Sequence, residues 1–203
     1  VAFAQHHGLK IGTIADLIRY RLRNERSVER VRAQPVQTEF GEFTLYAYED
    51  RLGQDVHLAL TRGDLRGQEP PLVRVHVVDP LRDLLGIRAD PLAWTLRAAM
   101  ERIARAGNGV IVILRDRESP YDLLESVRSV VIPALGGGDA PPDAAKGTPR
   151  IRRDGEVLRT FGVGAQILKD LGVRRMRVLS APKQMHGIAA FGLEIDGYVG
   201  EDV

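Results

Sequence analysis

The chain has 203 residues, of which 44% are hydrophobic and 28% charged. It is therefore long enough to bury a hydrophobic core without disulfides or structural metals. With 29 basic and 27 acidic residues, a formal net charge of +2 and 5% aromatic residues, its composition argues against a dedicated nucleic-acid-binding protein. The complete lack of cysteine excludes disulfides, thiolate zinc sites and a cysteine nucleophile, and it fits a cytoplasmic location. No apolar run approaches the length of about 18 residues that a membrane span needs.

The N-terminal segment has neither an initiator Met nor the basic start and long apolar stretch of a signal peptide, so we expect a piece of a longer protein. Thr13 and Asp16 form a start like that of a capping box. The apolar residues after them recur at helical spacing, which predicts a helix from Thr13 to Arg26.

From Val36 onward the apolar pattern changes to a period near two, which predicts strands. These stretches are broken at Gly41, and a further strand is expected where apolar residues alternate over 56–60. Pro70 and Pro71 open the run 72–78, which is typical of a buried strand.

Helices and strands alternate in the second half of the chain. The expected elements are a helix over Leu92–Ala106 ended by Gly107, a strand over Val110–Leu114, a loop over 133–149, a helix over Phe161–Leu171 ended by Gly172, and strands at Arg177–Leu179 and Leu193–Ile195. A strand-rich first half followed by helix–strand alternation predicts a mixed α/β (α+β) fold rather than a doubly wound parallel sheet.

Two glycine-rich segments suggest phosphate loops. The residues after Gly136–Gly138 lack the Gly-Lys-Ser/Thr of a Walker loop, so that segment is interpreted as a flexible turn. Gly162 and Gly164, at the expected helix start, fit either an anion site or close backbone packing, and packing is favoured. The arginine clusters 150–153 and 174–177 favour solvated surface over a phosphate or nucleotide site.

The histidines and serines carry no recognisable motif. No histidine pair has metal-ligand spacing, and no serine has a nucleophile-elbow context. His76, Asp79 and Asp90 could form an oxygen-rich metal site, although such scattered groupings are seldom ligands.

Several segments together resemble one family. Residues 1–10 and 13–21 are similar to the tail of 3,4-dihydroxy-2-butanone 4-phosphate synthase, which in bifunctional riboflavin-biosynthesis proteins runs into a GTP cyclohydrolase II domain. The segments that resemble GTP cyclohydrolase II are Gly41–Phe43, His57–Leu60, Arg62–Leu65, Leu72–His76, Phe161–Arg174 and Gly192–Ile195. The resemblance implies a GTP cyclohydrolase II-like fold, with 1–30 as the synthase tail and linker and 31–203 as the GTP cyclohydrolase II-like domain.

The zinc motif of that family is incomplete here. The family holds zinc with Cys-x10-Cys-x-Cys directly after a Val-Arg-Val-His strand, and the metal activates the water that opens the guanine ring. In register, Asp79 stands at the first cysteine, and Asp90 and Leu92 stand near the other two. Two carboxylates and a leucine do not rebuild a soft-ligand site. The resemblance therefore implies that zinc has been lost.

Four residues remain from the family's nucleotide site. Glu118 survives in the loop that approaches the nucleotide, and Arg159 matches the arginine proposed to attack phosphate, although Val157 replaces the aspartate beside it. Ser180 and Lys183 keep the hydroxyl and the lysine of a Thr-Asn-Asn-Pro-Lys stretch. On this resemblance Arg159 is a catalytic remnant and Glu118, Ser180 and Lys183 are nucleotide-binding remnants, each equally compatible with a solvated surface role.

The resemblance thus implies a GTP cyclohydrolase II-like domain without ring-opening activity, acting in assembly, regulation or ligand binding. The alternative is a residual nucleotide phosphohydrolase or cyclohydrolase that uses Arg159 and a non-thiolate metal site, for instance magnesium on Asp79 and Asp90. No cofactor is expected in this chain, whereas magnesium would belong to the upstream synthase domain. The expected partners are a second copy in a homodimer, the fused synthase domain, and a nucleotide or flavin-pathway ligand, with no nucleic acid and no membrane.

Overall fold

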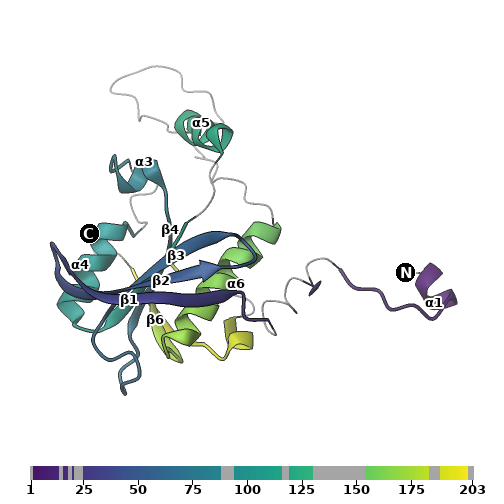
Figure 1. Ribbon diagram of the computed structural model, residues 1–203, viewed down its shortest axis with the longest axis horizontal. Coiled ribbons are helices and arrows are strands. Elements are labelled where there is room, and N and C mark those ends of the chain that lie inside the picture. Colours follow the sequence, from purple (N-terminus) through teal and green to yellow (C-terminus); the bar gives the residue numbers. More distant parts are fainter. Residues whose placement is uncertain are drawn as a thin grey trace.

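The computed structural model describes residues 2–13, 16–17, 20, 25–87, 94–115, 119–129, 154–182 and 188–200 (Figure 1). Within these residues, seven strands form one mixed sheet in the order β1-β2-β3-β5-β4-β6-β7. The strands are β1 (Val28–Thr38), β2 (Gly41–Asp50), β3 (Asp55–Arg62), β4 (Leu72–Val77), β5 (Gly109–Leu114), β6 (Arg175–Leu179) and β7 (Glu194–Val199). The helices are α1 (Ala2–His6), α3 (Pro80–Asp83), α4 (Leu96–Ala106), α5 (Pro120–Ser129), α6 (Asp154–Asp170) and the 3-10 helix η1 (Ile188–Phe191). The prediction of a mixed α/β fold is confirmed.

One half of the sheet is antiparallel. β1, β2, β3 and β5 pair antiparallel in that order, and β1 forms the edge. The strand begins at Val28, earlier than the Val36 expected from the sequence. Nearly all side chains of its first part are exposed, and an edge strand that is exposed on both faces carries no alternating apolar pattern.

The other half is parallel. β5, β4, β6 and β7 are parallel neighbours, and parallel strands need crossover connections. Helices α3 and α4 lie between β4 and β5 in the chain, and α5 and α6 lie between β5 and β6. The Thr95 side chain caps α4 by accepting a hydrogen bond from the Ala98 amide, and Gly107 ends the helix at φ 73°, a left-handed conformation that favours glycine. Because the cap is Thr95, the helix starts at Leu96, later than the predicted Leu92.

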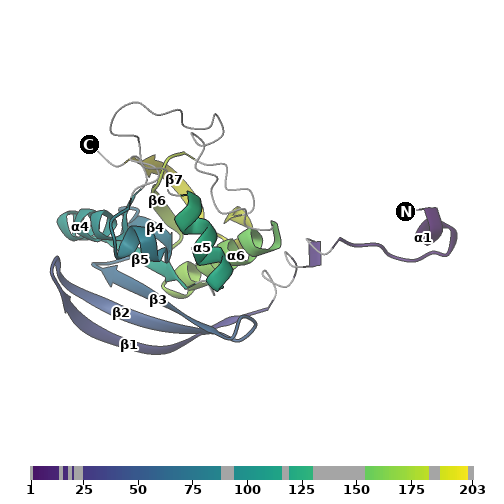
Figure 2. The same ribbon diagram turned by 90° about the horizontal axis from the view of Figure 1, so that it is seen from above.

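Helices α4 and α6 cover opposite faces of the sheet, which the view in Figure 2 shows between them. β5 supplies alternate residues to both faces. Val110, Val112 and Leu114 join the core beneath α6, whereas Ile111 and Ile113 face the α4 side. This alternation follows from the period of two in a strand.

Helix α6 begins at Asp154, well before the expected Phe161. Gly162 and Gly164 therefore lie inside the helix, where their amides belong to the helical ladder, and the expectation of a glycine pair at a helix start is wrong. A Cβ atom on Gly164 would lie 3.3 Å from Cγ1 of Val75. Close packing of α6 against β4 thus accounts for this glycine.

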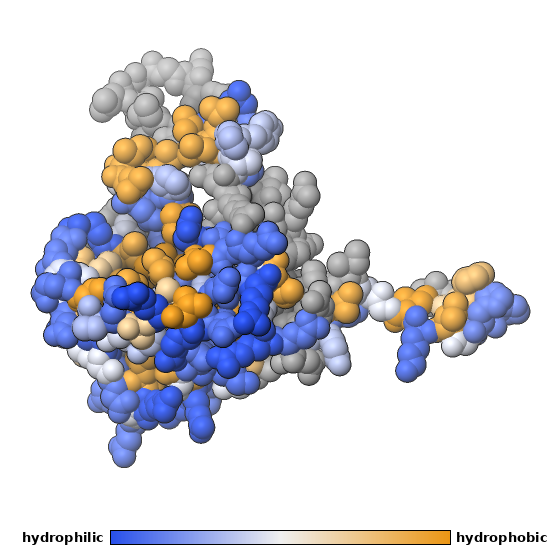
Figure 3. Space-filling model, viewed as in Figure 1, coloured by the Kyte–Doolittle hydropathy of each residue, from blue (hydrophilic) through white to orange (hydrophobic). Residues whose placement is uncertain are grey.

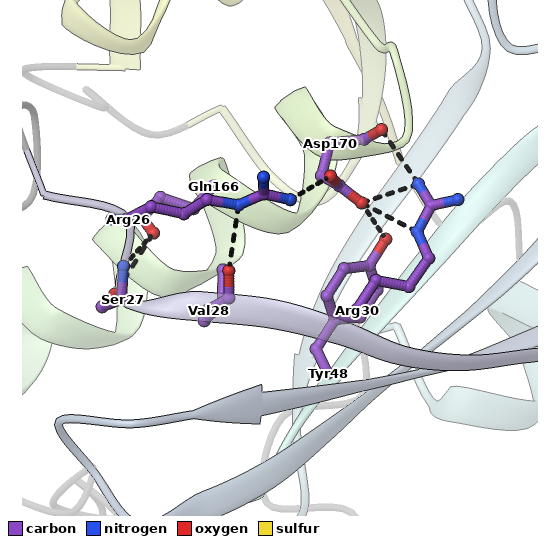
Figure 4. Close-up of polar contacts among 7 residues, drawn as sticks. All are labelled: Arg26, Ser27, Val28, Arg30, Tyr48, Gln166 and Asp170. Carbon is purple, nitrogen blue, oxygen red and sulfur yellow. Dashed lines mark hydrogen bonds and ion pairs between the residues drawn. The ribbon is translucent and has the colours of Figure 1, made fainter.

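Asp170, in the last turn of α6, joins the helix to the antiparallel strands (Figure 4). Its carboxylate accepts hydrogen bonds from the Tyr48 hydroxyl at 2.9 Å, from Arg30 Nε at 2.9 Å and Nη2 at 2.6 Å, and from Arg26 Nη2 at 2.7 Å. Burial, followed by the hydrogen bond to Asp170, raises the pKa of Tyr48, so the phenol stays protonated and donates.

Before β1, the Thr13 hydroxyl accepts a hydrogen bond from the Asp16 amide at 3.0 Å, and Asp16 Oδ2 lies 3.4 Å from the Thr13 amide, which confirms the capping box. Much of the predicted helix after it, the loop 133–149 with Gly136–Gly138, and arginines 150–153 lie outside the described residues. In the part of the chain that the structure describes, no helix is long and apolar enough to cross a membrane.

Candidate functional site

The carboxyl ends of the four parallel strands meet at one edge of the sheet. Asp79 comes just after β4, Arg115 directly after β5 and Ser180 directly after β6. In open α/β sheets, ligands bind outside the carboxyl ends of the strands. This edge, called the carboxyl edge below, is therefore the candidate functional site.

Asp79 is the N-cap of the short helix α3. Its Oδ1 accepts hydrogen bonds from the backbone amides of Leu81 at 3.0 Å and Arg82 at 3.2 Å. Pro80 follows at the first helical position, where a missing N–H group is tolerated. Oδ2 of Asp79 lies 3.7 Å from the Arg82 guanidinium. Both carboxylate oxygens are thus engaged in local structure.

His76 fixes α3 to the end of β4. The buried imidazole has its Nε2 2.8 Å from Oδ2 of Asp83, an oxygen that also accepts a hydrogen bond from the Asp79 amide at 3.0 Å. Burial lowers the pKa of His76, although the Asp83 carboxylate acts in the opposite direction. We therefore expect a neutral imidazole near pH 7, donating from Nε2 to the carboxylate.

This lowered pKa predicts a pH dependence of stability. The unfolded chain binds the His76 proton more tightly than the folded chain. The contribution of neutral His76 to the free energy of unfolding is therefore complete above the unfolded pKa of about 6.5, and it is lost as the pH falls. We expect urea unfolding to show a decline of at most about 1.4 kcal/mol per pH unit below that value from this residue. His76→Gln should unfold more easily at pH 7.5 but lose less stability between pH 7.5 and 5.5. Equal slopes in the two proteins would contradict the assignment.

The residues described at this edge do not fit the zinc that the resembled family holds. The chain has no cysteine, and Asp79, which the resemblance predicts at the first ligand position, caps α3 with its carboxylate. Asp90 and Leu92 lie outside the described residues. Among the residues that are described, no three His, Cys, Asp or Glu side chains gather as metal ligands would. The alternative magnesium site on Asp79 and Asp90 stays a prediction, because Asp90 lies outside the described residues.

Of the four predicted site residues, only Ser180 has a described side chain. It is buried, directly after β6, and its hydroxyl donates to the Ala181 carbonyl at 2.7 Å. Arg159 lies in α6, but its side chain lies outside the described residues, as do Glu118 and Lys183. The assignment of these residues to a nucleotide site stays a prediction.

A second buried histidine at this edge was missed by sequence reasoning. The Arg115 amide donates to His57 Nδ1 at 3.2 Å, which leaves the hydrogen on Nε2, 3.9 Å from Oδ2 of the buried Asp50. The Arg115 guanidinium lies 3.9 Å from Asp55. These residues come from three neighbouring strands, so no local spacing in the sequence could have grouped them.

Arg74 and Trp94 tie the ends of the strands together. Arg74 donates to the Leu179 carbonyl at 2.9 Å and to the Trp94 carbonyl at 3.1 Å, and the Trp94 indole donates to the Val199 carbonyl at 2.9 Å. Most polar contacts described at this edge are therefore made to backbone or between the side chains themselves, whereas Nδ1 of His76, Oδ1 of Asp83 and Nε of Arg74 are buried without a hydrogen-bond partner in this part of the chain. Such an arrangement stabilises a surface, and it offers no assembled nucleophile or metal centre within the described residues.

Apolar side chains are exposed beyond this edge. Figure 1 places α3 and α5 past the end of β4, and Figure 3 shows orange, apolar residues gathered on both. The exposed residues Leu84 and Leu85, directly after α3, and Tyr121, Leu124 and Val127 of α5 are each at least half exposed, and we call them the α3/α5 apolar surface. Exposed apolar groupings of this kind are characteristic of interaction surfaces.

Comparisons with known proteins find matches over nearly the whole chain. The model of the GTP cyclohydrolase II family matches residues 29–200. A 3,4-dihydroxy-2-butanone 4-phosphate synthase of Pseudomonas aeruginosa is 49% identical over 198 residues, which cover 98% of this chain and 50% of that protein. The riboflavin biosynthesis protein RibBA of Synechocystis is 35% identical over 198 residues, or 96% of this chain and 34% of that protein.

A solved structure is also similar. RibBX, described as a two-domain 3,4-dihydroxy-2-butanone 4-phosphate synthase from A. baumannii, superposes with a TM-score of 0.65 at 35% identity, covering 98% of this chain and 48% of that one. The chain spans about half the length, or less, of these relatives.

Proposed function

Because the chain belongs to the GTP cyclohydrolase II family, we propose that it is a GTP cyclohydrolase II-like domain without zinc-dependent ring-opening activity, which acts by binding within a riboflavin-biosynthesis protein. One observation carries the proposal. Asp79, at the position of the family's first zinc thiolate, is the N-cap of α3, and the chain has no cysteine elsewhere.

The chemistry of the lost reaction explains why this replacement matters. Opening the guanine ring and releasing formate need an activated water, which zinc supplies in the family by lowering the pKa of a bound water molecule. Here Oδ1 of Asp79 accepts hydrogen bonds from two backbone amides, and Oδ2 lies near the Arg82 guanidinium. The neighbouring His76 is hydrogen-bonded to Asp83. These residues hold the backbone after β4 in place of a metal.

The proposed role is assembly with, and regulation of, a 3,4-dihydroxy-2-butanone 4-phosphate synthase domain. Relatives carrying that name are about twice as long as this chain, and RibBX is described as having two domains. The α3/α5 apolar surface supports a binding role, because its side chains remain exposed in the isolated chain. A homodimer and a nucleotide or flavin-pathway ligand belong to the same proposal.

The proposal is tested by GTP turnover. We expect the purified protein to release neither formate nor pyrophosphate from GTP with zinc or magnesium added. Formate release should be at least about a thousandfold below that of a family member with the complete cysteine motif, because several kcal/mol of transition-state stabilisation are lost with the metal. Stoichiometric zinc in the purified protein should also be absent by elemental analysis.

Formate release within about a thousandfold of that of a family member with the complete cysteine motif, or one equivalent of bound zinc, would overturn the proposal. Pyrophosphate without formate would instead support the phosphohydrolase alternative, provided that Arg159→Ala abolishes it.

A further inference from the structure

A hollow of about 300 Å³ lies at the opposite edge of the sheet from the candidate site. It is bordered by the start of β4, the C-terminal half of α4, the residue before β5, and β6. Its polar lining includes Glu69, Arg102, Arg105, Asn108 and Arg177. The hollow shares no residue with the carboxyl edge, so it is independent of the proposed function.

The side chains that line the hollow carry a net positive charge. Three guanidinium groups line it, from two residues of α4 and one of β6, against the single carboxylate of Glu69. Arg105 pairs with Glu101 and stands in the last turn of α4, where a cation also interacts favourably with the helix dipole. Local structure therefore accounts for Arg105.

Local structure does not account for Arg102. In the described part of the chain, Nε of Arg102 is buried without a hydrogen-bond partner, whereas the side chain of Arg177 is exposed at the hollow. Buried polar atoms in folded proteins nearly always have a partner. Oδ1 of Asn108, on the same hollow, is likewise buried without a partner in this part of the chain.

These groups define the chemistry of a ligand. Guanidinium forks match the oxygens of phosphate, to which they bind in pairs of parallel hydrogen bonds. The acceptor on Asn108 suits a hydroxyl, whether that of a protonated phosphate or of the organic part of a monoester. A water molecule could satisfy single atoms, but only an anion would also compensate the positive charge of the guanidinium groups that line the hollow.

We propose that this hollow is a phosphate-binding site, formed by Arg102 and Arg177 with Asn108 as the acceptor. For the exposed arginine cluster 174–177, the alternative to a phosphate site is a solvated surface. Arg175 fits this alternative, because it pairs with Asp196 at the protein surface. Arg177 differs from Arg175 in facing the hollow.

The test is calorimetric titration of the full chain with inorganic phosphate and, in parallel, with glycerol 3-phosphate, at constant ionic strength set with chloride. We expect saturable binding at one site and an increase of about tenfold or more in Kd for Arg177→Ala and for Arg102→Ala. Arg177→Ala removes an exposed side chain, so folding is preserved. Arg97→Ala is the matched control. Like Arg102→Ala it removes one positive charge from α4, but Arg97 pairs with Glu39 and does not line the hollow.

Binding of both anions with equal affinity would assign the site to the phosphate group alone, and tighter binding of glycerol 3-phosphate would assign it to a monoester. The proposal is overturned if neither anion saturates the wild-type protein, or if Arg97→Ala weakens binding as much as Arg177→Ala does. Neither result bears on GTP turnover, so the two proposals fail separately.

Discussion

Phe43→Ala is expected to lower the free energy of unfolding by about 4 kcal/mol. Phe43 is 2% exposed, and its side chain belongs to the core between β2 and α4. Removing the ring deletes its transfer free energy and leaves a cavity that the surrounding sheet cannot fill. The Arg62 guanidinium, 5.6 Å from the ring centroid, loses its aromatic partner as well.

The change is measured by urea unfolding followed by circular dichroism. Phe3→Ala is the matched control, since Phe3 is 70% exposed, and it should change stability by no more than about 0.5 kcal/mol. Phe43→Leu should recover most of the loss, because it restores most of the volume. If the two alanine variants were equally stable, the assignment of Phe43 to the core would be wrong.

Asp170→Ala is expected to cost about 3 kcal/mol. The substitution removes the acceptor of the Tyr48 hydroxyl and of the Arg26 and Arg30 guanidinium groups at once. Tyr48 is completely buried, so its hydroxyl would lose its partner without gaining water. Asp170→Asn, which keeps an acceptor oxygen, should cost less.

The control for this variant is Asp196→Ala. Asp196 also receives two hydrogen bonds from a guanidinium, but its partner Arg175 is largely exposed, and surface ion pairs contribute about 0–1 kcal/mol. Urea unfolding of the two alanine variants should therefore differ by about 2 kcal/mol or more. Equal losses would mean that the Asp170 cluster contributes no more than a surface ion pair.

The buried elements of the fold could be predicted from the sequence. β4 and β5 were found because they are apolar runs bounded by Pro71 and Gly107, and α4 was found because its apolar face is regular. β1 was placed too late because its side chains face solvent on both sides. Helix α3 was missed, although Asp79 followed by Pro80 is a recognisable helix start.

The candidate site was predictable only in part. The family resemblance singles out Asp79 at the first zinc-ligand position and Ser180 as a remnant hydroxyl of the nucleotide site, and the structure places both residues at the carboxyl edge. The contact between His57 and Asp50 depends on strand pairing and leaves no spacing pattern in the sequence. His76 and Asp83 are seven residues apart, across the end of a strand and a helix, which is likewise not a recognised motif.

The alternation of side chains along β5 has a consequence for how the protein unfolds. If the α4 layer detached alone, Ile111 and Ile113 would be exposed to water while Val110 and Val112 stayed packed under α6. Detaching α6 alone would uncover the other face of the same strand. Exposing either face of β5 to water would cost the free energy of burying its apolar side chains. We therefore expect neither layer to unfold independently, and the sheet and both helices to unfold in one cooperative transition.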